Sequence, residues 1–447
     1  MTPFRNTADK ICQIIPLCIF VGKNDLTGPE DVLAMDLELY TIRQRFNRSC
    51  SENIAEAVKR EMAAVQNRLI PGAAIAIAAG SRGISGLDQI VRSVVAAVRE
   101  AGCRPFIVPA MGSHGSGSAE GQSRILAEAG ITEQNVGAPI RSSMEVIELP
   151  VSDFGHRVFM DRNAFESDGV ILINRIKPHT DFHGRYESGL VKMAVIGLGK
   201  HAAAVEIHSF GIPGLLERVP QSFHQILQSG KILFGLAVVE NAYDRPAHIE
   251  AIPAERILDR EPELLDLARR NMPRLPVEDI DVLILDRMGK EISGVGMDPN
   301  IIGRLGIRGQ PEPVSPRIKA IMVSALSPHS YGNAIGMGLA DVITRKLYDS
   351  VDFEAMYVNV RASLFLERVK VPFIAESDAE GFCLALKSCG RIEAGAERVV
   401  RIRDTLSLET VQVSSSILQE LGERVEVLGA ARSAFNGQGA LVKAFEE

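Results

Sequence analysis

Four of the nine histidines in this 447-residue chain lie within the short segment from Ile176 to Ser209. Imidazole side chains can bind a borderline metal ion or transfer protons near neutral pH. A lysine lies there among apolar residues, where partial loss of water lowers the pKa of an amine and makes it nucleophilic. The side chains concerned are His179, His183, Lys192, His201 and His208. The segment therefore predicts a metal site, an acid–base site or both.

Short apolar runs alternate with stretches of helical periodicity through the first half of the chain, which is typical of βαβ units. The predicted elements are strands at 72–79, 106–110 and 169–174 and helices at 87–101 and 118–129. The three strands end in loops that carry Arg82, His114 and His179. Because ligands bind at the carboxyl ends of the strands in open α/β sheets, we expect these loops to share one site.

A second α/β unit is predicted after the charged, proline-containing stretch at 269–277, with strands at 281–285 and 320–326. The chain is too long for one ordinary domain and long enough for two hydrophobic cores. We therefore expect an α/β protein of two α/β domains, with the active site in the cleft between them. The N-terminal catalytic and cofactor-binding domain is predicted at 1–275, and the C-terminal domain that closes the active site at 276–447.

Composition narrows the class of partner. The formal charge of −7 and the pI near 5.8 show no basic surplus, so we expect no nucleic-acid partner. The six cysteines lack CxxC spacing, which argues against a disulfide framework or a zinc ribbon. Apolar stretches of membrane-spanning length and a recognisable signal peptide are not found. We predict a cytoplasmic protein without a membrane partner and make no prediction of its oligomeric state.

Four motifs occur in a characteristic order: GSRG at 80–83, AMGSHG at 110–115, KPHTDFHGRYESGLVKM at 177–193 and EIHS at 206–209. This series resembles the nickel-pincer lactate racemase family, well over roughly residues 75–210 and loosely elsewhere. In that family a lysine is tethered to a nickel-pincer nucleotide, a pyridinium-3,5-bisthiocarboxylic acid mononucleotide nickel complex. A histidine sixteen residues after this lysine binds the nickel.

The resemblance assigns cofactor roles residue by residue. Lys192 and His208 have the spacing of the tethering lysine and the nickel-binding histidine. Ser188 and Gly189 match the turn beside the tether, where backbone N–H groups can hold the cofactor phosphate. Arg82 matches an arginine that steadies the substrate carboxylate, and we expect it to contribute to cofactor binding as well. The resemblance further implies that separate biosynthetic enzymes supply the cofactor.

The activity implied by the resemblance is inversion of a hydroxyl-bearing carbon. The cofactor accepts a hydride from this carbon and returns it on the other face, while two histidines act as general acid and base. His114 matches the first histidine. The second is His179 or His183, and we favour His179 because it directly follows a predicted strand. His201 is expected to be an exposed helix residue without a role.

One departure from the family concerns the substrate. Residues 297–304 occupy the place of a tyrosine–glutamine pair and a lysine that contact lactate, and Ile302 and Gly303 cannot make the same hydrogen bonds. We therefore expect a small-molecule 2-hydroxy acid other than lactate. The candidate substrate contacts are Lys290, Asn300 and His329.

Two other classes remain open. The first is a zinc- or manganese-dependent hydrolase or lyase that uses His179, His183 and His208, with Asp181 or Glu187 as a carboxylate ligand. The second is a non-catalytic cofactor-binding homologue that kept the fold without turnover.

Overall fold

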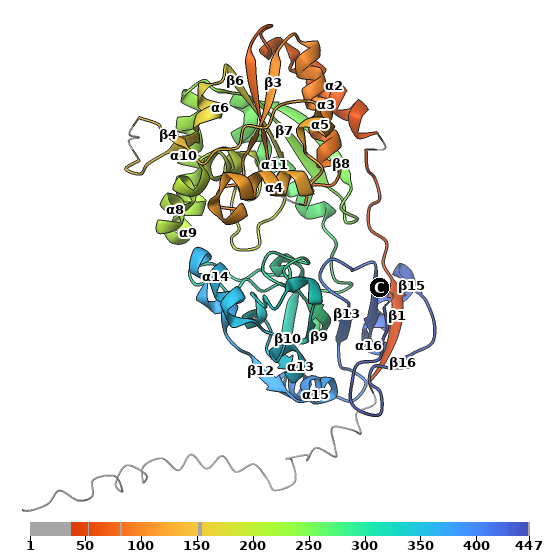
Figure 1. Ribbon diagram of the computed structural model, residues 1–447. Helices are drawn as coiled ribbons and strands as arrows, with labels where there is room; N and C mark the ends of the chain where they lie inside the picture. The colour runs from red at the N-terminus through yellow and green to blue at the C-terminus, as the bar shows by residue number, and fades with distance from the viewer. Residues whose placement is uncertain (1–36, 52, 81–82, 151–153, 446–447) are drawn as a thin grey trace, which may run out of the picture.

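The computed structural model describes residues 37–51, 53–80, 83–150 and 154–445, and it contains two α/β units that Figure 1 shows one above the other. The upper unit runs from orange to green in sequence colour, and the lower unit from teal to blue. This arrangement agrees with the predicted α/β class. None of the described helices combines the length and the apolar composition needed to cross a bilayer.

The first unit is built on a five-stranded sheet of order β3-β2-β6-β7-β8, in which β8 alone is antiparallel to its neighbour. Its strands are β2 (Ala74–Ala79), β3 (Arg104–Pro109), β6 (Gly169–Arg175), β7 (Ile232–Glu240) and β8 (Pro246–Pro253). β2 is apolar throughout because both faces of the sheet are covered, and Ile77 lies between Ile107 and Ile171. The three strands predicted in this half are confirmed.

Helices cover both faces of this sheet. Ile75 and Ile77 of β2 pack into one hydrophobic cluster with α2 and α3, and Ala76 and Ala78 pack into another with α7, α10 and α11. The helices are α2 (Ile54–Ala64), α3 (Leu87–Glu100), α4 (Ala119–Glu128), α5 (Glu133–Val136), α6 (Arg162–Glu166), α7 (Leu190–Lys192), α8 (Lys200–Ser209), α9 (Gly211–Pro213), α10 (Val219–Gln228) and α11 (Ile257–Asn271). A small antiparallel pair, β4 (Val146–Glu148) and β5 (Phe159–Asp161), lies beside them. The predicted helices at 87–101 and 118–129 are confirmed as α3 and α4, and Ser118 caps α4 by accepting from the Gly121 N–H.

The second unit has a larger sheet of order β12-β11-β10-β9-β13-β14-β1-β15, with β16 also paired to β1. The five strands from β12 to β13 are parallel, and the remaining pairings are antiparallel. The strands are β9 (Asp279–Met288), β10 (Arg317–Leu326), β11 (Val342–Thr344), β12 (Phe373–Ala375), β13 (Val399–Ile402), β14 (Thr410–Val413), β15 (Glu426–Val427) and β16 (Arg432–Ser433). The helices are α12 (Pro299–Ile302), α13 (Arg345–Tyr348), α14 (Phe353–Ser363), α15 (Asp378–Ser388) and α16 (Ser415–Leu421). The strands predicted at 281–285 and 320–326 are confirmed as β9 and β10.

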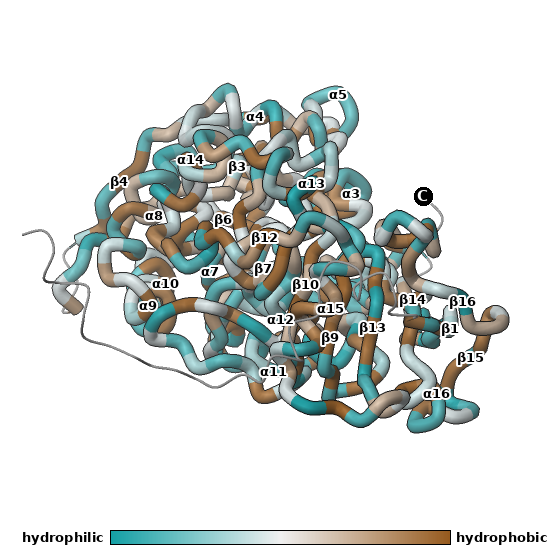
Figure 2. Tube along the Cα trace, turned by 90° about the horizontal axis from the view of Figure 1, so that it is seen from below, coloured by the Kyte–Doolittle hydropathy of each residue, from teal (hydrophilic) through white to brown (hydrophobic). Residues whose placement is uncertain are grey.

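Hydropathy follows this layering. Figure 2 shows largely hydrophobic colour along β9 and β13 and largely hydrophilic colour along the outer helix α5. The central residues of β9, from Ile280 to Leu285, are buried, as expected for a strand enclosed by helices.

One strand crosses from the N-terminal end of the chain into the second sheet. β1 (Glu38–Arg43) pairs with β14 and β15, and Figure 1 shows the chain after it running between the units to reach α2. The domain boundary that we predicted at residue 275 lies in the connection between α11 and β9. The second sheet thus contains a strand from the residues assigned by sequence to the first domain.

Candidate active site

The histidine segment begins as a clamped loop at the carboxyl end of β6. The backbone groups of Lys177 and Ser188 exchange two hydrogen bonds of 3.0 and 3.3 Å, which close the loop at its base. The Asn174 side-chain amide donates to the carbonyl of Gly189 at 2.7 Å. The loop that carries His179 and His183 is therefore anchored to the end of a buried strand.

Glu187 organises the interior of this loop. Its side chain has no exposed surface, and it accepts from the His179 N–H at 2.6 Å, the Gly184 N–H at 3.1 Å and His183 Nδ1 at 3.3 Å. Arg269 of α11 also donates to it, at 2.6 Å. Burial acts to raise the pKa of the Glu187 carboxyl, but the hydrogen bonds from His183 and His179 outweigh burial and the pKa is lowered. Glu187 is therefore an ionised partner for His183.

His179 and Lys192 contact each other through His179 Nε2 and Lys192 Nζ. The other ring nitrogen of His179, Nδ1, accepts from the backbone N–H of Asp181 at 3.0 Å. A backbone N–H can only donate, so Nδ1 of His179 carries no proton. A neutral His179 then carries its proton on Nε2, and this nitrogen can only donate to the lysine. The lysine must then accept, which an amine does only when it is unprotonated. The geometry thus favours the nucleophilic form of Lys192.

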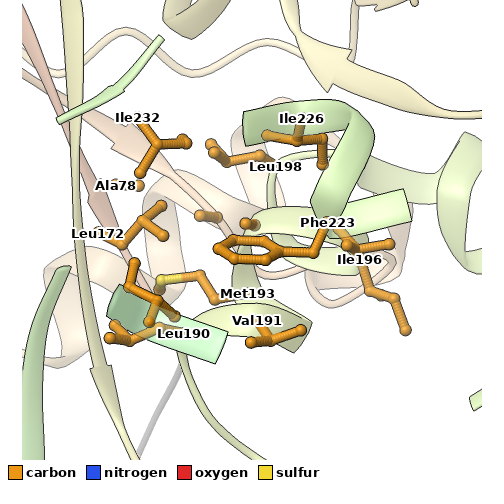
Figure 3. Packing of buried hydrophobic residues seen from close by; sticks show 14 of the residues in the cluster. Ala78, Leu172, Leu190, Val191, Met193, Ile196, Leu198, Phe223, Ile226 and Ile232 are labelled. Atoms are coloured by element: carbon orange, nitrogen blue, oxygen red, sulfur yellow. The ribbon is translucent and has the colours of Figure 1, made fainter. Parts of the chain in front are cut away.

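The position of Lys192 is set by its neighbours in the core. Figure 3 shows Leu190 and Met193 beside Leu172 of the sheet, and Val191 near Phe223 of α10. Since these three residues point into the core, Lys192 is turned toward the histidine loop. Burial lowers the pKa of the Lys192 amine to about 8, although Asp181 and Glu187 act in the opposite direction.

Two further histidines lie on α8, which follows Lys192 after the π-helical turn Met193–Gly197. His208 is half-buried, and burial together with the charge of Lys192 lowers the pKa of its ring. His179 responds in the same way: burial, Lys192 and Lys177 lower its pKa well below the usual range, and His208 adds to the effect. These mutual effects place Lys192, His179 and His208 in one electrostatic environment. His201 is exposed on the same helix.

His114 reaches this region from the loop after β3. The Gly112 N–H donates to the carbonyl of Gly197 at 3.2 Å, and a Cβ at Gly112 would lie 3.1 Å from the side chain of Ile196. The loop therefore packs against the π-helical turn between Lys192 and α8. His114 itself is exposed.

The second unit contributes side chains that hold the histidine loop. Asn300 Nδ2 donates to the carbonyl of His179 at 3.2 Å, and Gln310 Oε1 accepts from the His183 N–H at 3.3 Å. Arg368 donates to the carbonyl of Thr180 at 2.8 Å and lies 3.5 Å from the Asp181 carboxylate. Side chains of the second unit thus help to fix the shape of the histidine loop.

Not every residue predicted for the site is brought to this loop. Lys290 and His329 are exposed near the carboxyl ends of β9 and β10, where the Lys290 N–H donates to the hydroxyl of Ser330 at 3.0 Å. Asn300 contacts the loop, but its side chain donates to the backbone carbonyl of His179 and does not contact a histidine side chain. Arg82 lies outside the described residues.

Some residues of the site were not predicted from sequence. Gln310 and Arg368 lie far along the chain from the loop they hold, and Glu261 of α11 accepts from the Val191 N–H at 3.0 Å. Glu187 was named from sequence, but as a possible metal ligand and not as the hydrogen-bond partner of His183. Nothing in a single sequence indicates the contacts of Gln310, Arg368 and Glu261.

The ligand set required by a zinc or manganese hydrolase is not assembled. Within the described part of the chain, no three histidine, cysteine, aspartate or glutamate side chains are grouped so that they could hold a metal ion. This includes His179, His183 and His208. Asp181 and Glu187 are instead engaged with Arg368 and Arg269.

Comparison with known proteins finds similarity to lactate racemase. Residues 41–213 match the family described as the lactate racemase N-terminal domain. The chain is also similar to the lactate racemase apoprotein of Thermoanaerobacterium thermosaccharolyticum, with 14% identity and a TM-score of 0.50 over 84% of this chain and 99% of that chain. No curated protein matches. At this identity the structural likeness establishes the fold alone, and the family match covers residues 41–213. The chain is therefore a lactate racemase-like α/β protein whose residues 41–213 match the lactate racemase N-terminal domain family.

Proposed function

We propose that this protein is a racemase or epimerase of a 2-hydroxy acid other than lactate, working with a nickel-pincer nucleotide attached at Lys192. The family match supports racemase or epimerase chemistry in general. The observation that carries the finer proposal is the contact between Lys192 and His179, which favours an unprotonated lysine amine. An amine in this form can make the bond that a tether requires.

The residues present fit such a cofactor. Lys192 would hold it, the half-buried His208 would offer an imidazole to nickel, and the Ser188–Gly189 turn would lie beside its phosphate. A metal that arrives in an organic ligand needs few protein ligands, which suits a site where the described residues form no three-ligand cluster. When bound, the cofactor would accept and return a hydride at the substrate carbon.

The chain itself would handle the hydroxyl proton. Inversion needs proton-handling groups on both faces of the substrate, and His114 and the histidine loop come from different strand ends. Of the two loop histidines we now propose His183 as the partner of His114. Its Nδ1 pairs with the ionised Glu187 and its side chain is 32% exposed, which leaves Nε2 free to exchange a proton with substrate. His179 instead contacts Lys192, so we assign it the role of keeping the Lys192 amine unprotonated.

The substrate carboxylate would be bound by Arg82, as the resemblance implies. Lys290 and His329, exposed at the strand ends of the second unit, remain our proposed contacts for the rest of the substrate. Asn300 already donates to the carbonyl of His179 and to Asp298, so we assign it to supporting the loop rather than to substrate recognition.

The proposal is tested by loading the protein with the cofactor and assaying a panel of chiral 2-hydroxy acids for loss of optical purity. We expect inversion of at least one acid, nickel in the purified protein and a mass increase on the peptide containing Lys192. In His208→Ala nickel should be lost, whereas His201→Ala, an exposed histidine of the same helix, should keep it. A zinc-only protein without a nickel-pincer absorption spectrum, or inversion of none of the acids, would refute the proposal.

A further inference from the structure

We infer that Lys200, acting through Gln122, is a positioning residue that holds the His114 loop against the helix carrying His208. The importance of this loop for turnover rests on the proposed function. The contacts themselves do not depend on it. Both residues would act through His114, because Gln122 contacts the backbone of the His114 loop and Lys200 contacts Gln122.

Lys200 is a buried lysine with three acceptors around its Nζ atom. Its side chain has no exposed surface, and Nζ donates to the carbonyl of Pro109 at 2.5 Å and to Gln122 Oε1 at 3.1 Å and forms an ion pair with Asp161 Oδ2 at 3.2 Å. A buried ammonium is costly unless it is paired and hydrogen-bonded. These three acceptors come from the end of β3, from α4 and from the end of β5. Lys200 therefore joins three elements at one point.

The backbone of Lys200 is also unusual. Its φ of 56° lies in the left-handed region, which non-glycine residues adopt at an energetic cost. Lys200 is the first residue of α8, after Gly199. Lys200 thus fixes the loop to the first turn of the helix that carries His208.

Gln122 carries the connection to the loop. It has no exposed surface, and its Nε2 donates to the carbonyl of Gly112 at 2.8 Å and to that of His114 at 3.4 Å. The ammonium of Lys200 requires the oxygen of this amide to face it, because an NH₂ group there would oppose three N–H donors. The amide NH₂ must then face the loop. Lys200 thus orients the Gln122 amide so that its NH₂ group donates to the carbonyl of His114.

A merely structural contribution to the core would behave differently. Loss of ordinary packing weakens the whole first unit, whereas loss of this connection should loosen residues 112–118 and leave Lys192 and His208 in place. Gln122→Glu separates the two cases, since a carboxylate still pairs with Lys200 but repels the carbonyls of Gly112 and His114. Lys200→Met removes the ammonium and keeps an unbranched apolar side chain.

The experiment measures backbone hydrogen exchange by peptide mass spectrometry in the full chain, together with nickel content and steady-state kinetics after cofactor loading. In both variants we expect faster exchange at 112–118, unchanged exchange at 190–209 and retained nickel. We expect kcat to fall by about 10- to 100-fold with KM changed less than about two-fold, as for a misplaced catalytic group. Lys231→Met is the matched control, because this lysine donates to the carbonyl of Ser167 near the opposite end of the sheet.

Two outcomes would overturn the inference: unchanged exchange at 112–118, or faster exchange spread evenly over the first unit. If Lys200→Met does not fold, Gln122→Glu alone decides, since it keeps the buried charge paired. If the wild-type protein inverts no 2-hydroxy acid, the proposed function fails, but the exchange measurement still decides whether Lys200 and Gln122 hold the loop.

Discussion

At the scale of single residues, His179 and His183 differ in what their ring nitrogens contact. His179 uses Nδ1 to accept from a backbone N–H and presents Nε2 to Lys192. His183 uses Nδ1 to face the buried Glu187 carboxylate. A backbone donor makes the first ring a proton donor to the lysine, while a carboxylate allows the second ring to gain and lose a proton. The same loop thus contains two imidazoles with different chemistry.

This difference predicts different defects on substitution. In cofactor-loaded protein, His183→Gln should lower kcat by about 10²- to 10⁴-fold, the contribution of a general acid–base group, with the Lys192 peptide still modified. His179→Gln should reduce the fraction of Lys192 that is modified, with turnover per modified site changed less. Intact-mass analysis combined with kinetics measures both. The opposite pattern would return the acid–base role to His179.

Sequence could predict part of this arrangement. The roles of Lys192 and His208 came from the family resemblance, which their sixteen-residue spacing matches; the spacing alone would not have assigned them. The choice between His179 and His183 could not be made well, because it depends on which nitrogen meets Glu187 and which meets the Asp181 N–H. Such contacts depend on the fold of a loop closed by Lys177 and Ser188, and no periodicity in the sequence reports them.

At the scale of elements, α11 stabilises the start of the segment from α7 to α8 through a buried hydrogen-bond acceptor. Glu261 of α11 is almost fully buried, and it accepts from the backbone N–H groups of Val191 and Leu190 at the start of α7. Its Oε1 is buried without a hydrogen-bond partner among the described residues. Burial raises the pKa of the Glu261 carboxyl to about 7, although the two backbone hydrogen bonds act to lower it.

A carboxyl with a raised pKa makes stability depend on pH in a defined direction. Its stabilising contribution is complete below the unfolded pKa of about 4.5 and is lost as the pH rises through the folded pKa of about 7. Glu261→Gln cannot ionise, so it should match wild type near pH 4.5 and be more stable at pH 8 by about 1–3 kcal/mol.

Thermal unfolding of wild type and Glu261→Gln across this pH range measures the effect. Glu263→Gln is the matched control, because Glu263 lies on the same helix with a side chain that is 65% exposed. The control should follow the pH trend of wild type. A constant difference between wild type and Glu261→Gln from pH 4.5 to 8 would contradict a raised pKa.

Most regular elements of the first unit could be predicted because their apolar residues repeat with the period of a strand or helix. α3 shows this well: its buried residues recur on one side from Leu87 to Val98. The π-helical turn after Lys192 could not be predicted, since its five residues are all buried and apolar and show no period. The pairing of β1 with β14 was equally hidden, because it joins segments at opposite ends of the chain.

At the scale of the whole molecule, the histidine loop belongs to one unit and is completed by the other. Arg368 is only 1% exposed, and its contacts with Thr180 and Asp181 cross between the units. Its Nε and Nη1 atoms are buried without a hydrogen-bond partner among the described residues. Arg368 therefore joins the two units, but burying its two unpaired donors costs folding free energy.

Removing this arginine should open the molecule with little loss of stability. In Arg368→Met the desolvation cost disappears together with the contacts, so we expect Tm to stay within about 4 °C of wild type. We expect a larger radius of gyration by small-angle X-ray scattering and a raised KM in loaded protein. Arg308→Met is the control, because Arg308 is 90% exposed and pairs with Glu367 on the surface. Identical scattering of Arg368→Met and wild type would contradict the role in closure.

The strand β1 has a consequence for how such opening can occur. The chain passes between the units twice, once between β1 and α2 and again between α11 and β9. Two units joined by one chain segment can rotate about it. A second connecting segment resists this rotation and leaves bending as the easier motion. The two units would then move about a hinge that contains both connecting segments. Each closing motion would then bring Asn300, Gln310 and Arg368 back to the same part of the histidine loop, so chain connectivity would help to keep these residues aligned with it.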